Sequence, residues 1–137
     1  PLGDLPPALA GLPRAEVNQG ESVIRESRRF YQTDAPLQEG VVAHYRQGEG
    51  LATLWIARAE TAEAARVVVE GFIGTVQAGG TLYTLAETRT VNRITVYALQ
   101  GQKRVQYLFA AGDRVVLLDV FPKWAEGALQ DLLPALP

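Results

Sequence analysis

Two stretches of the chain repeat one pattern and decide the predicted fold: YRQGEGLATLWI at residues 45–56 and FAAGDRVVLLDV at residues 109–120. In each stretch a pair that begins with glycine separates two runs of β-prone, largely apolar residues. Glycine readily adopts the positive φ that a tight hairpin turn requires. Gly48-Glu49 and Gly112-Asp113 therefore predict two-residue β-hairpin turns, and Gly101-Gln102, between similar runs, predicts a third.

These turns also predict which side chains share a face of the sheet, because side chains alternate along a strand and a two-residue turn sets the register. One face, called the apolar face below, receives Val41, Ala43, Tyr45, Ala52, Leu54, Ile56, Ile94, Val96, Ala98, Val105, Tyr107, Phe109, Val116, Leu118 and Val120. The other, called the mixed face, combines leucines with His44, Arg46, Trp55, Arg93, Tyr97, Gln106 and Asp119.

The remaining elements follow from apolar periodicity and turn residues. Strands are predicted near 22–31, 40–46, 51–58, 91–99, 103–110 and 114–121, with a further extended piece near 81–86. Helices are predicted near 62–77 and 123–133. Thr61 is the expected N-cap of the first helix, and Pro134 limits the second.

A shift of 64 positions places Gly48 on Gly112 and also superposes the apolar faces of the two predicted helices. We therefore predict two strand–strand–strand–helix units, at about 21–80 and 81–137, in one α+β domain. The expected architecture is a two-layer sandwich. A mainly antiparallel sheet of six or seven strands carries both helices on its apolar face.

Residues 1–20 contain four of the eight prolines and predict an irregular N-terminal arm. The mixed face is too apolar to lie bare in water as one patch, so something should cover part of it. We expect the arm to do so first. A homodimer partner, or a ligand or partner protein, is the alternative.

Composition narrows the classes of function. The chain of 137 residues has a net charge of −2, which disfavours nucleic acid and anionic membranes as partners. The absence of cysteine excludes disulfides, thiolate nucleophiles and Cys-ligated metals. Scarce Cys, Met and Asn are typical of thermophilic proteins, whereas the two lysines against eleven arginines are not, so thermophily stays open. No transmembrane segment is predicted, and the localisation stays open between the cytoplasm and export after removal of a leader.

Catalytic motifs are scarce. His44 is the only histidine, no sequence resembles a phosphate-binding loop or a nucleophile elbow, and we predict no metal site and no cofactor. The leading hypothesis is a non-catalytic binding or protein-interaction domain that uses the mixed face. The alternative is a small enzyme in which His44 acts as general acid or base, with Asp119 and either Arg46 or Arg93 around an anionic substrate.

The order of hairpins and helices resembles that of small bacterial domains of unknown function, many of which are exported. This resemblance implies an association with the bacterial cell envelope and names no ligand.

Overall fold

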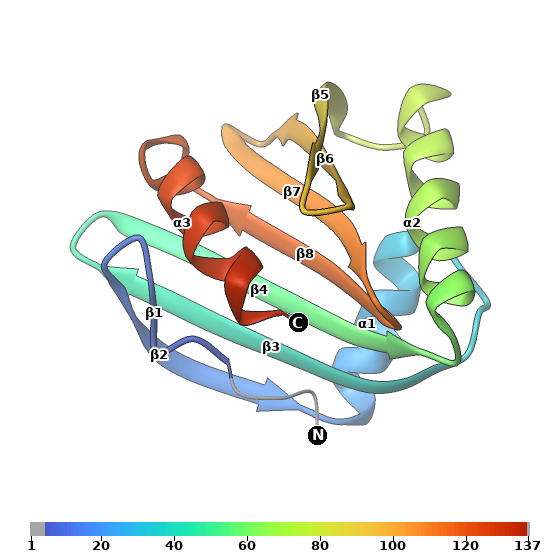
Figure 1. Cartoon of the computed structure of the whole chain (residues 1–137), viewed down its shortest axis with the longest axis horizontal. Coiled ribbons are helices and arrows are strands. Elements are labelled where there is room, and N and C mark those ends of the chain that lie inside the picture. Colours follow the sequence, from blue (N-terminus) through green and yellow to red (C-terminus); the bar gives the residue numbers. More distant parts are fainter. Residues whose placement is uncertain (1–4, 137) are drawn as a thin grey trace.

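The hairpin turns at Gly48-Glu49 and Gly112-Asp113 form as predicted, in a single antiparallel sheet in the computed structural model, which describes residues 5–136 (Figure 1). The sheet has eight strands in the order β1-β2-β3-β4-β8-β7-β6-β5. The strands are β1 (Ala8–Leu9), β2 (Leu12–Gln19), β3 (Leu37–Gln47), β4 (Gly50–Ala59), β5 (Thr84–Val91), β6 (Ile94–Gly101), β7 (Arg104–Ala111) and β8 (Arg114–Val120). The α-helices are α1 (Glu21–Tyr31), α2 (Ala62–Gln77) and α3 (Ala125–Leu132), and short 3-10 turns at Pro122–Trp124 and Leu133–Ala135 flank α3. The α+β class and the antiparallel sheet are confirmed, with more strands and helices than predicted.

The register of the first hairpin is the predicted one. Val41 lies opposite Ile56, and Gly48 has the positive φ of 59° that its turn requires. The third turn lies one residue further along, at Gln102 and Lys103, where both φ values are positive. Gly101 therefore pairs with Arg104. The register moves by two residues, so the assignment of side chains to faces is unchanged.

The predicted apolar face is confirmed as one side of the core. Its strand residues join a cluster with Ala125, Ala128, Leu129 and Leu132 of α3. The N-terminal segment belongs to the same cluster through Leu9 and Leu12. Within the described part of the chain, α3 is the one α-helix that contributes to this cluster.

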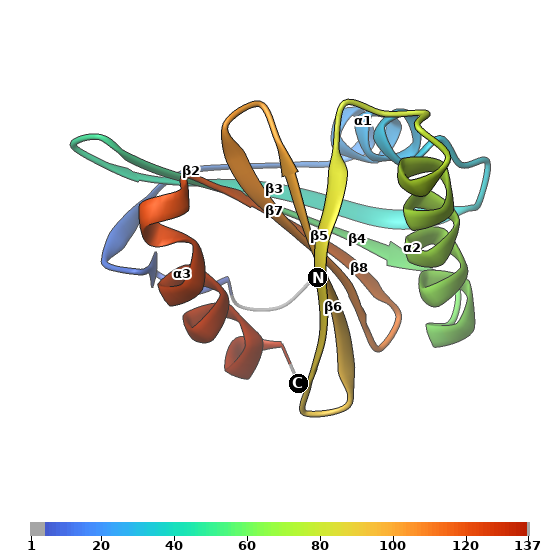
Figure 2. The same cartoon turned by 90° about the horizontal axis from the view of Figure 1, so that it is seen from above.

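The prediction that both helices cover the apolar face is wrong. Buried residues of α2 cluster with Ala57, Leu99, Leu108, Val115 and Leu117, which lie on the mixed face. The chain therefore forms three layers, with α3 on one side of the sheet and α1 and α2 on the other (Figure 2). The physical reason is that the central strands are apolar on both faces, and each face must be buried.

Residues 22–31, predicted as a strand, form helix α1. Its buried residues are Val23, Ile24, Ser27 and Tyr31, which follow the helical spacing of three to four residues. Arg28 and Arg29 in the last turn complement the negative end of the helix dipole. The first unit thus has a helix between its first strand and its hairpin, and the prediction of two strand–strand–strand–helix units is wrong.

The N-terminal arm is ordered sheet rather than an irregular segment, as far as it is described. Strands β1 and β2 extend the sheet beyond β3, and the Tyr45 hydroxyl donates to the carbonyl oxygen of Pro6 at 2.8 Å. The backbone N–H of Ala10 donates to Oδ2 of Asp131, a residue of α3, at 2.7 Å. The arm therefore packs on the side of α3, and the prediction that it covers the mixed face is wrong for residues 5–20. Residues 1–4 of the predicted arm, and Pro137, lie outside the described residues.

The helices of the two predicted units do not occupy equivalent places in the fold. Leu54 and Leu118, equivalent in the alignment, lie opposite each other where β4 pairs with β8. The helices that follow, α2 and α3, pack on opposite faces of the sheet. Their predicted equivalence is therefore wrong, because apolar periodicity shows that a helix has a buried side and not which sheet face that side meets.

Candidate ligand-binding site

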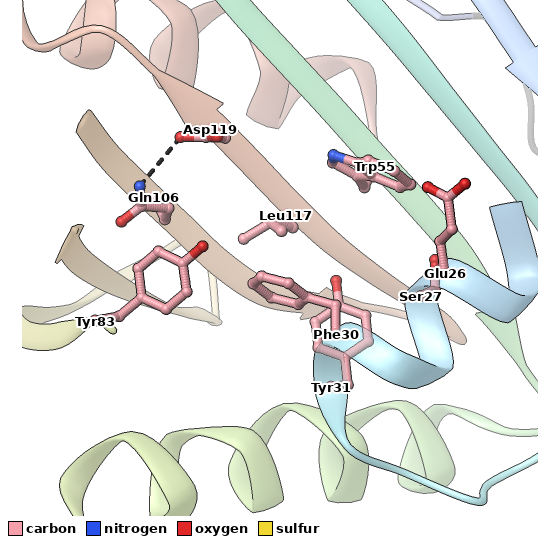
Figure 3. Close-up of a pocket in the computed structure, with 9 residues that line it drawn as sticks. All are labelled: Glu26, Ser27, Phe30, Tyr31, Trp55, Tyr83, Gln106, Leu117 and Asp119. Atoms are coloured by element: carbon pink, nitrogen blue, oxygen red, sulfur yellow. Dashed lines mark hydrogen bonds between the residues drawn. The ribbon is translucent and has the colours of Figure 1, made fainter. Parts of the chain in front are cut away.

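A cavity of about 260 Å³ lies on the mixed face between α1, the sheet and the segment before β5 (Figure 3). Its lining residues are Glu26, Ser27, Phe30, Tyr31, Trp55, Tyr83, Gln106, Leu117 and Asp119. Four of the nine are aromatic and two are carboxylates. Ligand sites in proteins combine apolar walls with a few placed polar groups in this way, and the volume suits a small molecule or one side chain.

Helix α1 supplies one wall. Glu26 and Phe30 are four residues apart, as are Ser27 and Tyr31, so all four project from one side of the helix. Ser27 and Tyr31 are buried, Phe30 is half-buried and Glu26 is exposed at the rim. The helix thus contributes an aromatic floor and an acidic edge.

The second wall is Tyr83, which belongs to the segment between α2 and β5. The centroid of its ring lies 5.8 Å from that of Phe30, and the Phe30 ring stacks on Phe72 of α2 with a centroid distance of 4.9 Å. The ring also lies over the backbone of Gly101, where an added Cβ would stand 2.4 Å from Tyr83 Cδ1. Gly101 therefore makes room for this wall.

The polar end of the cavity is a hydrogen-bonded group on neighbouring strands. Asp119 Oδ1 accepts from Gln106 Nε2 at 3.1 Å and from Arg104 Nε at 3.0 Å. Gln106 Nε2 also donates to the carbonyl oxygen of Gly101 at 3.1 Å. Gln106 is 1% exposed, and its Oε1 has no hydrogen-bond partner in the described part of the chain. A buried acceptor without a donor is uncommon in proteins and often marks a place for a donor that is missing.

Burial and the neighbouring charges change the pKa of the Tyr83 hydroxyl. Burial, and then the negative charge of Asp119, raise the pKa of the Tyr83 hydroxyl, while Arg104 lowers it by less. Burial likewise raises the pKa of the Tyr31 hydroxyl well above its ordinary range. Both hydroxyls are therefore neutral at physiological pH and can donate hydrogen bonds.

The structure brings three of the predicted site residues together, because Trp55, Gln106 and Asp119 all line this cavity. With the shift of 64 positions, Trp55 and Asp119 occupy equivalent positions on the mixed face and differ in chemistry. The predicted face does not include their neighbours from α1, because the β-prone residues of that segment favour a strand. Tyr83 was missed because it lies before β5, outside the phased hairpins.

Arg93 and Tyr97 lie elsewhere. They line a second hollow of about 260 Å³ beside α2, together with Arg66 and Glu70. This hollow is more polar than the first, and it shares none of its lining residues.

His44 and Arg46 line neither hollow. Arg46 Nη2 lies 3.8 Å from Glu16 Oε2 on β2. His44 Nδ1 lies 3.4 Å from the hydroxyl of Thr53, and Thr53 on β4 stands between His44 on β3 and Asp119 on β8. Two strand spacings, roughly 10 Å, therefore separate the backbones of His44 and Asp119. Nothing in this geometry pairs the two as base and acid.

Two further findings concern residues 5–136. Among them, no three or more Asp, Glu or His side chains are grouped so that they could hold a metal ion. No helix within the same range has both the length and the apolar character needed to cross a membrane.

No family model matches this chain, and no curated protein is significantly similar to it in sequence.

Proposed function

We propose that the chain is a non-catalytic binding domain whose site is the aromatic cavity between α1, Tyr83 and the sheet. The observation that carries this proposal is the cavity's construction, with Phe30, Trp55 and Tyr83 as aromatic walls and the polar side chains of Gln106 and Asp119 at its sheet end. Aromatic walls contribute apolar contact, and a few placed polar groups orient the ligand.

The partners of the cavity's polar groups favour binding over chemistry. Asp119 is held by Arg104 and Gln106, and His44 is not a lining residue. The enzyme alternative would need a substrate that bridges His44 and Asp119 across β4, and neither hollow on this side of the sheet joins them.

A protein partner is the second candidate for the same surface. Leu82, next to Tyr83, is 77% exposed, the most exposed large apolar side chain within residues 5–136. Aromatic side chains are enriched at protein interfaces, and the exposed leucine would add apolar contact area beside them. A homodimer through the mixed face itself is less favoured, because α1 and α2 cover much of that face.

The test uses the intrinsic fluorescence of Trp55. Trp124 is the only other tryptophan, so the Trp124→Phe variant leaves a single reporter in the cavity. We expect members of a small aromatic fragment set to change Trp55 emission, and to shift backbone NMR signals of α1, β7 and β8 in the unmodified chain.

The matched pair of variants is Trp55→Ala and Tyr97→Ala. Both residues are half-buried aromatics on the mixed face, in hollows of about 260 Å³. The NMR shifts should disappear in folded Trp55→Ala and persist in Tyr97→Ala. A fragment set that leaves every cavity signal unchanged, or binding that Tyr97→Ala removes, would contradict the proposal.

A further inference from the structure

The charged residues that line the cavity are all acidic. Its nine lining residues include the carboxylates of Glu26 and Asp119 and no lysine, arginine or histidine. The second hollow of equal volume contrasts with it, since Arg66 and Arg93 line that one along with Glu70. The two hollows therefore suit different ligands, although both open on the same side of the sheet.

The carboxylate of Glu26 is available to a ligand. It makes no hydrogen bond or ion pair with any other residue in the 5–136 range. Figure 3 shows it extending from α1 toward the ring of Trp55, at the edge of the cavity. A cation that contacts Trp55 at this edge of the cavity would also be close to the carboxylate of Glu26 (Figure 3).

The neighbours of Asp119 donate hydrogen bonds to only one of its two carboxylate oxygens. Both of its hydrogen bonds, from Arg104 and Gln106, reach the same oxygen, Oδ1. The side chain is 22% exposed, and Oδ2 accepts no hydrogen bond from the described residues. The sheet end of the cavity therefore offers Asp119 Oδ2 as an acceptor that no described residue occupies. The amide nitrogen of Gln106 faces Asp119, and its Oε1 is buried on the other side (Figure 3).

Aromatic rings complete the site. Phe30, Tyr31, Trp55 and Tyr83 surround the space from α1, β4 and the segment before β5 (Figure 3). Ring faces attract cations, tryptophan most strongly, and the attraction grows when water is excluded. The acidic lining, the carboxylate of Glu26 at the rim and the ring faces all favour a positively charged donor.

We infer that the cavity binds an organic cation, a primary amine or amidine carried on a small aromatic or branched apolar group. This inference rests on the proposed binding function and adds the charge of the ligand to it. The apolar part contacts the rings, and the charged N–H groups donate to the carboxylate of Glu26 at the Trp55 end, while Asp119 adds negative charge at the other end (Figure 3).

The experiment titrates the Trp124→Phe chain with three probes of matched shape: benzylammonium, benzyl alcohol and benzoate. We expect benzylammonium to bind about five- to tenfold more tightly than benzyl alcohol, and benzoate to bind least. Added salt should weaken benzylammonium binding and leave benzyl alcohol unaffected.

Glu26→Gln in the same background should reduce the preference for benzylammonium over benzyl alcohol without changing the affinity for the alcohol. The change keeps the size of an exposed side chain, so the fold should be retained. Glu21→Gln, on the same helix and outside the cavity, is the control and should leave the preference unchanged.

The outcomes separate the inference from the function. Binding of benzyl alcohol or benzoate as tight as that of benzylammonium would overturn the cation assignment and leave the binding domain intact. A Trp55 signal that no probe changes would overturn both. Tighter binding of N-acetyl-arginine amide than of benzylammonium would support the cation class and assign its source to a partner protein's side chain.

Discussion

Gly101 shows at the scale of one residue how the cavity depends on a missing side chain. An added Cβ would stand 2.4 Å from Tyr83 Cδ1 and 3.1 Å from the carbonyl oxygen of Leu82. Gly101→Ala should therefore push Tyr83 away, weaken probe binding and lower the free energy of unfolding by about 1–3 kcal/mol. Urea unfolding and Trp55 titration measure the two effects.

Gly74→Ala is the control for that substitution. Gly74 lies inside α2, and a Cβ there would meet no heavy atom within 4 Å. Because alanine favours a helix more than glycine does, the free energy of unfolding of this variant should rise by up to about 1 kcal/mol, and probe binding should be unchanged. Unchanged binding in Gly101→Ala would mean that Tyr83 has no part in the site.

The site could be predicted from sequence only where strand alternation applies. Trp55, Gln106 and Asp119 were assigned to one face because two-residue turns set the phase of their hairpins, and all three line the cavity. Phe30 and Tyr83 come from a helix and an irregular segment, whose position relative to the sheet depends on tertiary packing. Alternation carries no information about that packing.

Among whole elements, α1 is the one that the sequence contained and the prediction missed. Val23, Ser27 and Tyr31 recur every four residues, which is a helical signal. The β-prone residues Val23, Ile24, Phe30 and Tyr31 favoured a strand instead. In contrast, α2 was predicted with its bounds and its Thr61 N-cap, whose hydroxyl accepts from the Ala64 N–H at 3.0 Å.

The turn between β5 and β6 is strained in a way that one substitution can relieve. Asn92 and Arg93 have φ values of 50° and 69°, in the left-handed region. Arg93→Gly would give the Asn-Gly pair that such turns prefer, so we expect a gain of roughly 0.5–1 kcal/mol in the free energy of unfolding, measured by urea unfolding. Arg93→Lys, which keeps a side chain there, should be neutral. Equal stability of the two variants would contradict this account of the turn.

An ion pair joins β5 to α3 and predicts a pH dependence. Arg89 Nη1 donates to Glu126 Oε2 at 3.2 Å, and the Tyr107 hydroxyl donates to Glu126 Oε1 at 3.3 Å. The hydrogen bond from Arg89 holds the pKa of Glu126 below its ordinary value of 4.5. The stabilisation is therefore complete above about pH 4.5 and is lost as the pH falls through the lower, folded-state pKa.

Glu126→Gln tests that dependence. The Glu126 side chain is 59% exposed, so solvent screens the pair. The substitution should lower the free energy of unfolding at pH 7 by about 0.2–1 kcal/mol. The difference from the unmodified chain should be smaller at pH 3 than at pH 7, because Glu126 takes up a proton as the pH falls through its lowered pKa. Glu49→Gln, in an exposed hairpin turn, is the control. A difference of equal size at both pH values would show that the pair contributes through packing alone.

At the scale of the whole molecule, the sheet separates two hydrophobic cores, and only one of them adjoins the cavity. The core between the sheet and α3 is closed by Leu9 and Leu12 from the N-terminal strands. The core on the other side, between the sheet, α1 and α2, contains the aromatic cluster that continues into the cavity. A defect in the first core should therefore lower stability and leave the ligand site intact.

Leu9→Ala tests this separation. Leu9 is fully buried, so the substitution should lower the free energy of unfolding by about 2–5 kcal/mol, as other large-to-small core changes do. Benzylammonium affinity, measured in water on the fraction that remains folded, should match that of the unmodified chain, because no lining residue belongs to the α3 core. Val17→Ala, on the exposed side of β2, should change neither quantity. A large loss of affinity in folded Leu9→Ala would mean that the N-terminal strands shape the cavity through the sheet, and the two cores would then have to be treated as one cooperative unit.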